Sequence, residues 1–149
     1  MIALTTREVL DSTLEAVAHV QQLAVEVAQR AGFRGFSLDQ ISFATHETTT
    51  NAVVHGNRYR SEKKLFIAIS VTEDRFEITI ADEGDGFDPK TLPDPLAPER
   101  LSRDSGRGVY LSRAFMDEYH VRSRDGGGTE VRLVKYLRLQ VTNPSARRS

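Results

Sequence analysis

The chain has 149 residues, with 20 Lys and Arg, 21 Asp and Glu, a formal net charge of −1 and no cysteine. Its length fits one domain, its near-neutral charge argues against direct nucleic-acid binding, and the lack of cysteine excludes disulfides, cysteine-bound metals and a cysteine nucleophile. No apolar stretch approaches the length of a membrane span and no signal peptide is recognisable, so we expect a cytoplasmic protein without membrane contact.

The first predicted element is a helix over residues 12–31. Ser12 and Glu15 form a capping box at its start, and Gly32 ends it. Polar residues share one side of this helix, and an unusually wide apolar arc covers the rest. We expect the arc to pack in the core, although part of it could seat a homodimer or another partner.

A second helix is expected over residues 38–56, with Ser37 or Asp39 near its cap. It contains consecutive threonines at positions 48–50. Because β-branched side chains lose rotamer freedom in a helix, this run is a poor helix former. We therefore expect tertiary contacts to hold this helix in place.

Alternating apolar positions predict strands over residues 65–71 and 76–82, joined as a hairpin. A helix over 107–117 follows, and a second hairpin over 119–124 and 129–137 closes the fold. Together these elements predict an α+β two-layer sandwich, with the helices on one face of a mixed, mainly antiparallel sheet.

The segment between the two hairpins carries four of the five prolines, at positions 89, 93, 95 and 98. Long loops inside compact domains are usually functional lids or disordered segments. We expect a lid over about residues 88–105, whose arginines either meet a phosphate or an acidic partner or are simply solvated. We assign residues 1–139 to a single domain and 140–149 to a flexible tail.

Glu47, Asn51 and His55 follow one another at intervals of four residues on the second helix and so share one face. A carboxylate, an amide and an imidazole at the edge of a core could hold a metal–phosphate group. By itself, the triplet is more often a solvated polar face.

Asp82 continues the inward alternation of the preceding strand. A carboxylate on the core side is costly unless a group donates to it. Gly84 and Gly86 follow and would leave room for a flat ligand whose amino group donates to Asp82. The alternative for this stretch is a tight turn capped by the aspartate.

Gly106 and Gly108 open the helix after the predicted lid, where backbone N–H groups can bind an anion. Gly128 and Thr129 lie at the start of the last strand. Each of these signals is weak alone, because glycines are also common at loop exits and strand starts.

Taken together, the motifs are far more specific. They are Glu-x-x-x-Asn-x-x-x-His on a helix, Asp-x-Gly-x-Gly after a strand, a long lid, Gly-x-Gly at a helix start and Gly-Thr on a strand. This order resembles the Bergerat-type ATP-binding fold shared by DNA gyrase, Hsp90, histidine kinases and MutL. The stretches 51–56 and 115–118 resemble the anti-sigma-factor serine/threonine kinases of that superfamily, and the resemblance covers about residues 10–137.

The resemblance implies an ATP- and Mg²⁺-dependent protein kinase that phosphorylates a serine or threonine of an antagonist protein and sequesters a sigma factor. It also implies roles for particular residues. These are Glu47 as general base, Asn51 as Mg²⁺ ligand, Asp82 as acceptor of the adenine amino group, Gly84 and Gly86 beside the base, Gly106 and Gly108 at the phosphates, and Thr129 next to Asp82 or the adenine.

The sequence departs from the family pattern at His46, where an apolar residue is usual, and at Val109, where a larger one is common. His46 could perturb the charge of Glu47. We expect His55 to be a buried, hydrogen-bonded histidine without a chemical role.

Two other functions remain to be weighed. The first is a non-catalytic ATP-binding module that switches partners, although an intact Glu47 favours the kinase. The second is a detached histidine-kinase catalytic domain. It is disfavoured because about a dozen residues precede the first predicted helix, too few for a helical hairpin with an acceptor histidine.

Overall fold

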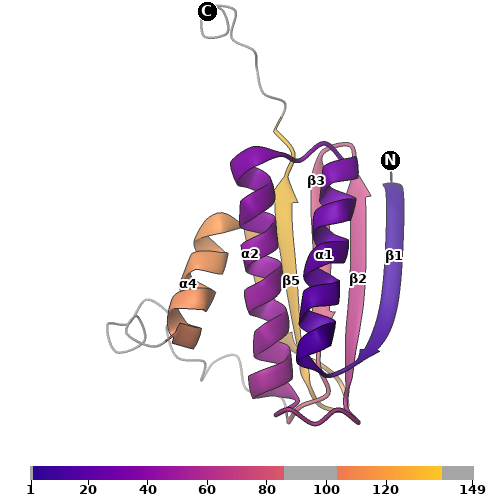
Figure 1. Ribbon diagram of the computed structural model, residues 1–149, viewed down its shortest axis with the longest axis vertical. Helices are drawn as coiled ribbons and strands as arrows, with labels where there is room; N and C mark the ends of the chain where they lie inside the picture. The colour runs from indigo at the N-terminus through magenta and orange to yellow at the C-terminus, as the bar shows by residue number, and fades with distance from the viewer. Residues whose placement is uncertain (1, 86–103, 139–149) are drawn as a thin grey trace, which may run out of the picture.

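The computed structural model describes residues 2–85 and 104–138. Within them, one sheet is covered on one face by three α-helices, the second of which continues into a short π-helix (Figure 1). The elements in chain order are β1 (Ile2–Asp11), α1 (Leu14–Arg30), α2 (Gly35–Asn51), the π-helix η1 (Ala52–Gly56), β2 (Lys64–Thr72), β3 (Arg75–Ala81), α4 (Asp104–Phe115), β4 (Glu118–Ser123) and β5 (Thr129–Tyr136).

The sheet has the strand order β1-β2-β3-β5-β4, and every neighbouring pair is antiparallel. The predicted two-layer α+β sandwich is confirmed, and within the described residues its sheet is entirely antiparallel where a mixed, mainly antiparallel sheet was expected. Because β5 lies beside β3, the start of β5 is next to the end of β3, where Ala81 pairs with Glu130. This pairing places the second hairpin beside the residues that follow β3.

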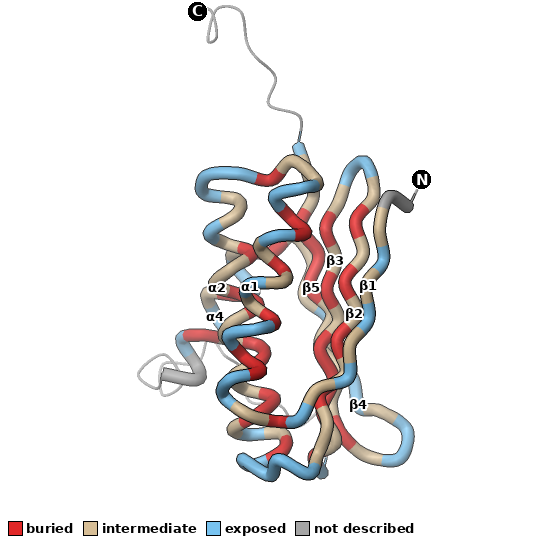
Figure 2. The backbone as a smooth tube through the Cα atoms, turned by 45° about the vertical axis from the view of Figure 1, so that its right-hand side comes forward, coloured by how far each residue is buried: buried red, intermediate tan, exposed pale blue. Residues whose placement is uncertain are grey.

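The core lies between the sheet and the helices, as the buried stretches of Figure 2 show. Along β2 and β3 buried and partly exposed residues alternate, as the sequence pattern predicted. The apolar arc of α1 is largely core: Val20, Ala24 and Ala28 are fully buried. Thr45 and Thr49 on α2 are also buried, and the Thr49 hydroxyl donates to the Thr45 carbonyl at 2.7 Å. These packing contacts support a segment of low helix propensity.

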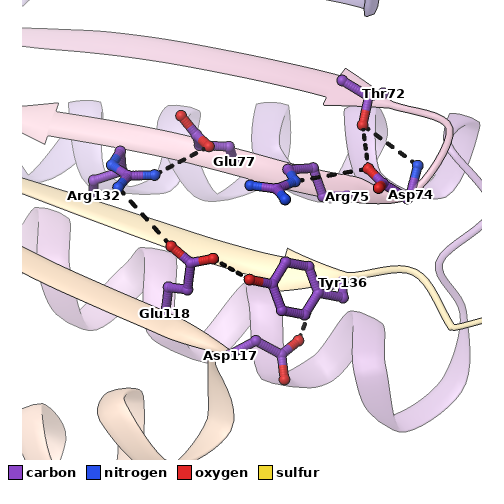
Figure 3. Close-up of polar contacts among 8 residues, drawn as sticks. All are labelled: Thr72, Asp74, Arg75, Glu77, Asp117, Glu118, Arg132 and Tyr136. Carbon is purple, nitrogen blue, oxygen red and sulfur yellow. Dashed lines mark hydrogen bonds and ion pairs between the residues drawn. The ribbon is translucent and has the colours of Figure 1, made fainter. Parts of the chain in front are cut away.

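Polar contacts also tie the last strands together (Figure 3). Arg132 on β5 donates to Glu77 on β3 at 3.2 Å and lies 3.9 Å from Glu118 on β4. Asp117, between α4 and β4, accepts the backbone N–H of Tyr136 at 2.7 Å through Oδ2. The C-terminal end of α4 is thus attached to β5.

Strand β1 was not predicted. Its half-buried and exposed residues alternate, and Val9 is 62% exposed, so its apolar pattern is weak. Pairing with β2 along almost its whole length holds it in the sheet. An edge strand stabilised by backbone hydrogen bonds leaves little trace in the side-chain pattern.

The helix boundaries differ from those expected. The N-cap of α1 is Thr13, whose hydroxyl accepts from Ala16 N at 3.1 Å, so the predicted Ser12 cap is wrong. Helix α2 begins at Gly35 after Arg34 and has no side-chain cap, so Ser37 and Asp39 lie inside the helix instead of capping it.

Most of the predicted lid, residues 88–103, lies outside the described residues, as do the predicted tail 140–149 and Gly86. The last two residues assigned to the lid, 104 and 105, are already in α4. Among the residues that the structure describes, no helix is both long and apolar enough to cross a membrane.

Candidate functional site

Asp82 follows β3 directly and is 4% exposed. Its Oδ1 accepts backbone N–H groups from Gly84 at 2.9 Å and Thr129 at 3.2 Å. Within the described parts of the chain, the hydrogen bonds that this carboxylate accepts both end on Oδ1. Oδ2 is therefore an acceptor with capacity for a ligand donor.

The electrostatics of Asp82 combine two opposing effects. Burial raises the pKa of this carboxyl above its usual value, because the charged form loses its water. The backbone hydrogen bonds from Gly84 and Thr129, and the positive charges of Arg124 and Lys63, act in the opposite direction. A buried carboxyl with a perturbed pKa is typical of a functional site.

Gly56 and Gly84 allow the π-helix to approach the end of β3. A Cβ at Gly56 would overlap the carboxylate of Asp82, and a Cβ at Gly84 would overlap the carbonyl oxygen of Gly56. The space left by the missing side chain at Gly84 is thus taken up by Gly56. Gly84 brings the backbones together rather than leaving the open slot that the sequence suggested.

The turn before β5 wraps Asp82 from the other side. Asp82 N donates to Thr129 O at 2.9 Å, while Thr129 N donates to the Asp82 carboxylate. Gly128 has φ of +102°, and a Cβ there would overlap the Asp82 carbonyl oxygen. The structure therefore brings Asp82, Gly84 and Thr129 into direct contact.

Glu47 and Gly108 form the second part of the site, between α2 and α4. A Cβ at Gly108 would overlap Oε1 of Glu47, so the carboxylate rests against the helix backbone. The second oxygen, Oε2, lies 3.5 Å from Nδ1 of His46. The imidazole of His46 is therefore close enough to the Glu47 carboxylate to interact with it.

The two glycines of α4 have different positions in the helix. Gly106 is in the first turn, where backbone N–H groups lack a partner within the helix. Gly108 is the fifth residue of the helix, beyond those free donors. Its lack of a side chain makes room for Glu47.

Asn51 is the last residue of α2, one helical turn after Glu47, and is partly exposed. His55 does not continue this face. The π-helix that begins at Ala52 has a wider turn, closed by Asn57 N donating to Ala52 O at 2.7 Å, and shifts the later residues around the axis. His55 is exposed, so the expected buried histidine is wrong.

Sequence reasoning missed Asn57. This residue is 1% exposed; its Oδ1 accepts from Glu83 N at 2.8 Å and its Nδ2 donates to Lys64 O at 3.1 Å. Asn57 thus joins the end of the π-helix to the segment after β3. The two residues after it, Arg58 and Tyr59, have positive φ angles of 53° and 62°. The one signal in the sequence was an asparagine directly after Gly56, where the second helix was expected to end.

These residues fit an adenine nucleotide. Asp82 presents a buried acceptor to an exocyclic amino group, and the first turn of α4 offers N–H groups to an anion. Within residues 2–85 and 104–138, no group of three His, Asp or Glu side chains could hold a metal ion alone. A cation here would need oxygen ligands from a bound phosphate in addition to Asn51.

Comparison with known proteins agrees with this geometry. A family model described as a histidine kinase-like ATPase domain matches residues 10–135. The chain is 36% identical over 118 residues to the serine-protein kinase RsbW of Bacillus subtilis, covering 74% of this chain and 72% of the relative. RsbW of Bacillus velezensis is 33% identical over 130 residues, or 83% and 79%. The anti-sigma F factor of Bacillus thuringiensis is 34% identical over 102 residues, or 67% and 70%.

Proposed function

The chain belongs to the family of histidine kinase-like ATPase domains, and we propose that it is an ATP-dependent serine/threonine protein kinase that acts as an anti-sigma factor. It would phosphorylate an antagonist protein and bind a sigma factor, in the cytoplasm. The names of the relatives, serine-protein kinase and anti-sigma F factor, support both halves of the proposal.

One observation carries the catalytic half. The Glu47 carboxylate rests against the backbone of α4 at Gly108, one turn along α2 from Asn51. A base next to a helix N-terminus and a metal-binding amide can act where phosphates lie.

We assign the remaining roles accordingly. ATP with Mg²⁺ would supply the phosphoryl group to be transferred. Glu47 would take the proton from the attacking hydroxyl, and Asn51 would be a ligand of the metal. Asp82 would orient the adenine, with Thr129 fixing Asp82. The backbone N–H of Gly106 would donate to phosphate, and Gly108 makes room for Glu47. Gly84 supports Asp82, and Gly86 would lie beside the adenine ring.

The other candidate is a non-catalytic module in which ATP only shapes the surface for a partner. The contact of Glu47 with His46 at 3.5 Å bears on this choice, because an imidazole beside the base can change the rate of proton transfer without changing ATP binding. The two candidates differ in one product, a phosphorylated partner.

The experiment is to incubate the full chain with candidate antagonist proteins and ATP–Mg²⁺, and to follow the intact mass of the partner. The proposal predicts a gain of one phosphoryl group on a serine or threonine. It also predicts that unphosphorylated and phosphorylated antagonist differ in their ability to release a sigma factor from the chain. Tight ATP binding with no transfer to any antagonist that binds the chain would favour the non-catalytic module.

Several large apolar side chains are exposed, among them Val9, Leu14 and Phe36. The proposal therefore includes a homodimer, in which a second copy of this chain covers part of this surface. Sedimentation of the full chain over a range of concentrations tests this part. A single monomeric species at all concentrations would exclude it.

A further inference from the structure

Arg124 is the first residue after β4 and makes two contacts with the end of the hairpin formed by β2 and β3. Its Nη1 donates to the backbone carbonyl of Asp82 at 2.9 Å. Its guanidinium carbon lies 4.5 Å from the ring centroid of Phe66, the β2 residue that pairs with Ala81. The sequence analysis gave this arginine no role, and the kinase mechanism does not use it.

The two contacts place Arg124 behind the site. Phe66 alternates with the buried Leu65 and Ile67, so its ring lies on the sheet face opposite the helices. The carboxylate of Asp82 instead meets Gly56 on the helix side. Arg124 therefore holds the Asp82 peptide from one face of the sheet while the carboxylate is presented on the other.

The turn that carries Arg124 is built to hold it there. Arg124 N donates to Gly128 O at 3.0 Å, and Gly127 N donates to Arg124 O at 3.2 Å. A guanidinium stacked on an aromatic ring also loses less freedom on forming a hydrogen bond than an ammonium on a flexible stem. This geometry is a fixed support rather than a mobile surface contact.

Arg124 also supplies charge. Among the described residues, Lys63 is the other cation that acts on Asp82, and its Nζ donates to Glu83 O at 3.0 Å. The neighbouring acidic side chain of Glu83 is turned to β2, where its Oε1 accepts from Lys64 N at 2.7 Å. Arg124 and Lys63 both lower the pKa of Asp82 against the effect of burial. A ligand amine donates a stronger hydrogen bond to the charged carboxylate than to the neutral carboxyl, so these cations favour the form that binds more tightly.

We propose that Arg124 is a positioning residue for nucleotide binding, which fixes the backbone of Asp82 and provides positive charge behind its carboxylate. The inference rests on the proposed function, because it takes Asp82 to be the acceptor of the adenine amino group. Arg124 itself does not touch the nucleotide. It determines the pH range over which Asp82 can bind one.

A purely structural role for Arg124 would give a different result from this electrostatic one. Arg124→Lys keeps the charge but loses the planar stack on Phe66. Arg124→Gln and Arg124→Met both lose the charge, and Met keeps an apolar stem on the ring. Arg122→Gln is the matched control. Arg122 lies on β4, two residues before Arg124, its side chain is 73% exposed, and it pairs with Glu130 and not with Asp82.

The experiment has two readouts on the full chain. The first is the titration of the Asp82 carboxyl carbon by NMR in the nucleotide-free protein, assigned through its loss in Asp82→Asn. The second is the affinity for ADP by calorimetry between about pH 5 and about pH 8, a range chosen around the raised carboxyl pKa. The first readout does not depend on the chain binding any nucleotide.

In Arg124→Gln and Arg124→Met the titration midpoint should rise above the wild-type value, while Arg124→Lys and Arg122→Gln should stay close to it. ADP affinity should fall at the acid end, by at most about tenfold for each unit of that rise, and should change little at the alkaline end. An unchanged midpoint in both uncharged variants would overturn the inference. A raised midpoint with unchanged ADP affinity at every pH would instead refute Asp82 as the adenine acceptor, and with it the proposed nucleotide site.

Discussion

At the residue scale, the ligand-binding role proposed for Asp82 comes at a cost to stability. It is 4% exposed, and burial raises its pKa. The charged form is therefore less favourable in the folded chain than in the unfolded chain. A residue of this kind is expected where its charge is used, since a neutral side chain of the same shape would pack at lower cost.

Asp82→Asn should separate binding from folding. The amide keeps Oδ1 as an acceptor for Gly84 N and Thr129 N but places an NH₂ group where the adenine amino group would donate. We expect ADP affinity to fall by about 1.5–3 kcal/mol, the range for hydrogen bonds to charged groups. Calorimetry that gives equal ADP affinity for the two proteins would contradict the assignment.

The same substitution predicts a pH dependence of stability. Because the pKa of Asp82 is raised above 3.8 in the folded state, the folded chain holds this proton more tightly than the unfolded chain. The contribution of Asp82 to the free energy of unfolding thus falls as pH rises from the pKa of the unfolded chain to the higher pKa of the folded chain. Asp82→Asn removes this loss of stability. Urea unfolding from about pH 4 to about pH 7 should show the variant gaining stability relative to wild type. A relative loss over that range would have the wrong sign.

At the scale of elements, the turn between β4 and β5 forms one wall of the site. Gly128 combines a φ of +102° with a backbone contact that a Cβ would overlap, at the Asp82 carbonyl. Gly128→Ala should lower the free energy of unfolding by more than the roughly 1–2 kcal/mol of a left-handed alanine, because the backbone must also move. It should weaken ADP binding as well.

Gly126→Ala is the matched control for this prediction. Gly126 has a φ of +85°, and nothing lies within 4 Å of its Cβ position. In this variant the free energy of unfolding should fall only by the cost of an alanine at a positive φ angle, and ADP binding should be normal. Equal losses of stability in the two variants, measured by urea unfolding, would show that the contact with Asp82 has no energetic weight.

The other wall of the site is α4, which carries Gly106 and Gly108, and the junction of α4 and β4 supports it. Asp117 accepts Tyr136 N at 2.7 Å through Oδ2 and Arg138 at 3.1 Å through Oδ1 (Figure 3 shows the contact with Tyr136). Asp117→Ala leaves the Tyr136 N–H without this partner and should cost about 1–3 kcal/mol in the free energy of unfolding.

Asp74→Ala serves as the comparison for Asp117→Ala. Asp74 accepts from the Thr72 hydroxyl at 2.7 Å, but its side chain is 75% exposed. Removing an exposed group of this kind should change stability by about 0.5 kcal/mol or less. A cost for Asp74→Ala as large as that for Asp117→Ala would show that the α4 junction is not specially stabilised by Asp117.

The strands that could be predicted from the sequence are those in which apolar, buried side chains alternate with more exposed ones. The prediction failed for elements that are held by backbone contacts with other parts of the chain. The strands β2 and β3 were found because one face of each is buried. Strand β1 is held by its pairing with β2, and the end of the π-helix η1 is joined through the Asn57 amide to Glu83 N, 26 residues further along the chain. No local pattern carries such information.

The site was partly visible for the same reason. The position of Asp82 followed from strand parity, and its burial agrees. The contact of Glu47 with Gly108 joins two helices through residues that are 61 positions apart in the chain, and it could not be inferred from either helix alone. The continuation of the Glu47–Asn51 face to His55 failed because the sequence does not show the extra residue in the π-turn.

At the scale of the whole molecule, the sheet order brings the parts of the site together. Because β5 pairs with β3, Thr129 reaches Asp82, and because α2 and α4 lie side by side on one face, Glu47 reaches Gly108 (Figure 1). The proposed kinase thus uses one wall for the base of the nucleotide and the other for the phosphates. Binding and phosphate transfer should therefore be separable by mutation.

The measurement that tests this account most directly compares Glu47→Gln with Asn51→Ala, using ATP affinity and single-turnover phosphate transfer to a bound antagonist protein. Glu47→Gln keeps the size of the side chain but cannot take the proton, so transfer should fall by about 10²–10⁴ while ATP affinity stays close to that of the wild type. Asn51→Ala should weaken ATP–Mg²⁺ binding itself, because a metal ligand is lost. Near wild-type transfer by Glu47→Gln would contradict the base assignment and leave the non-catalytic module as the better account.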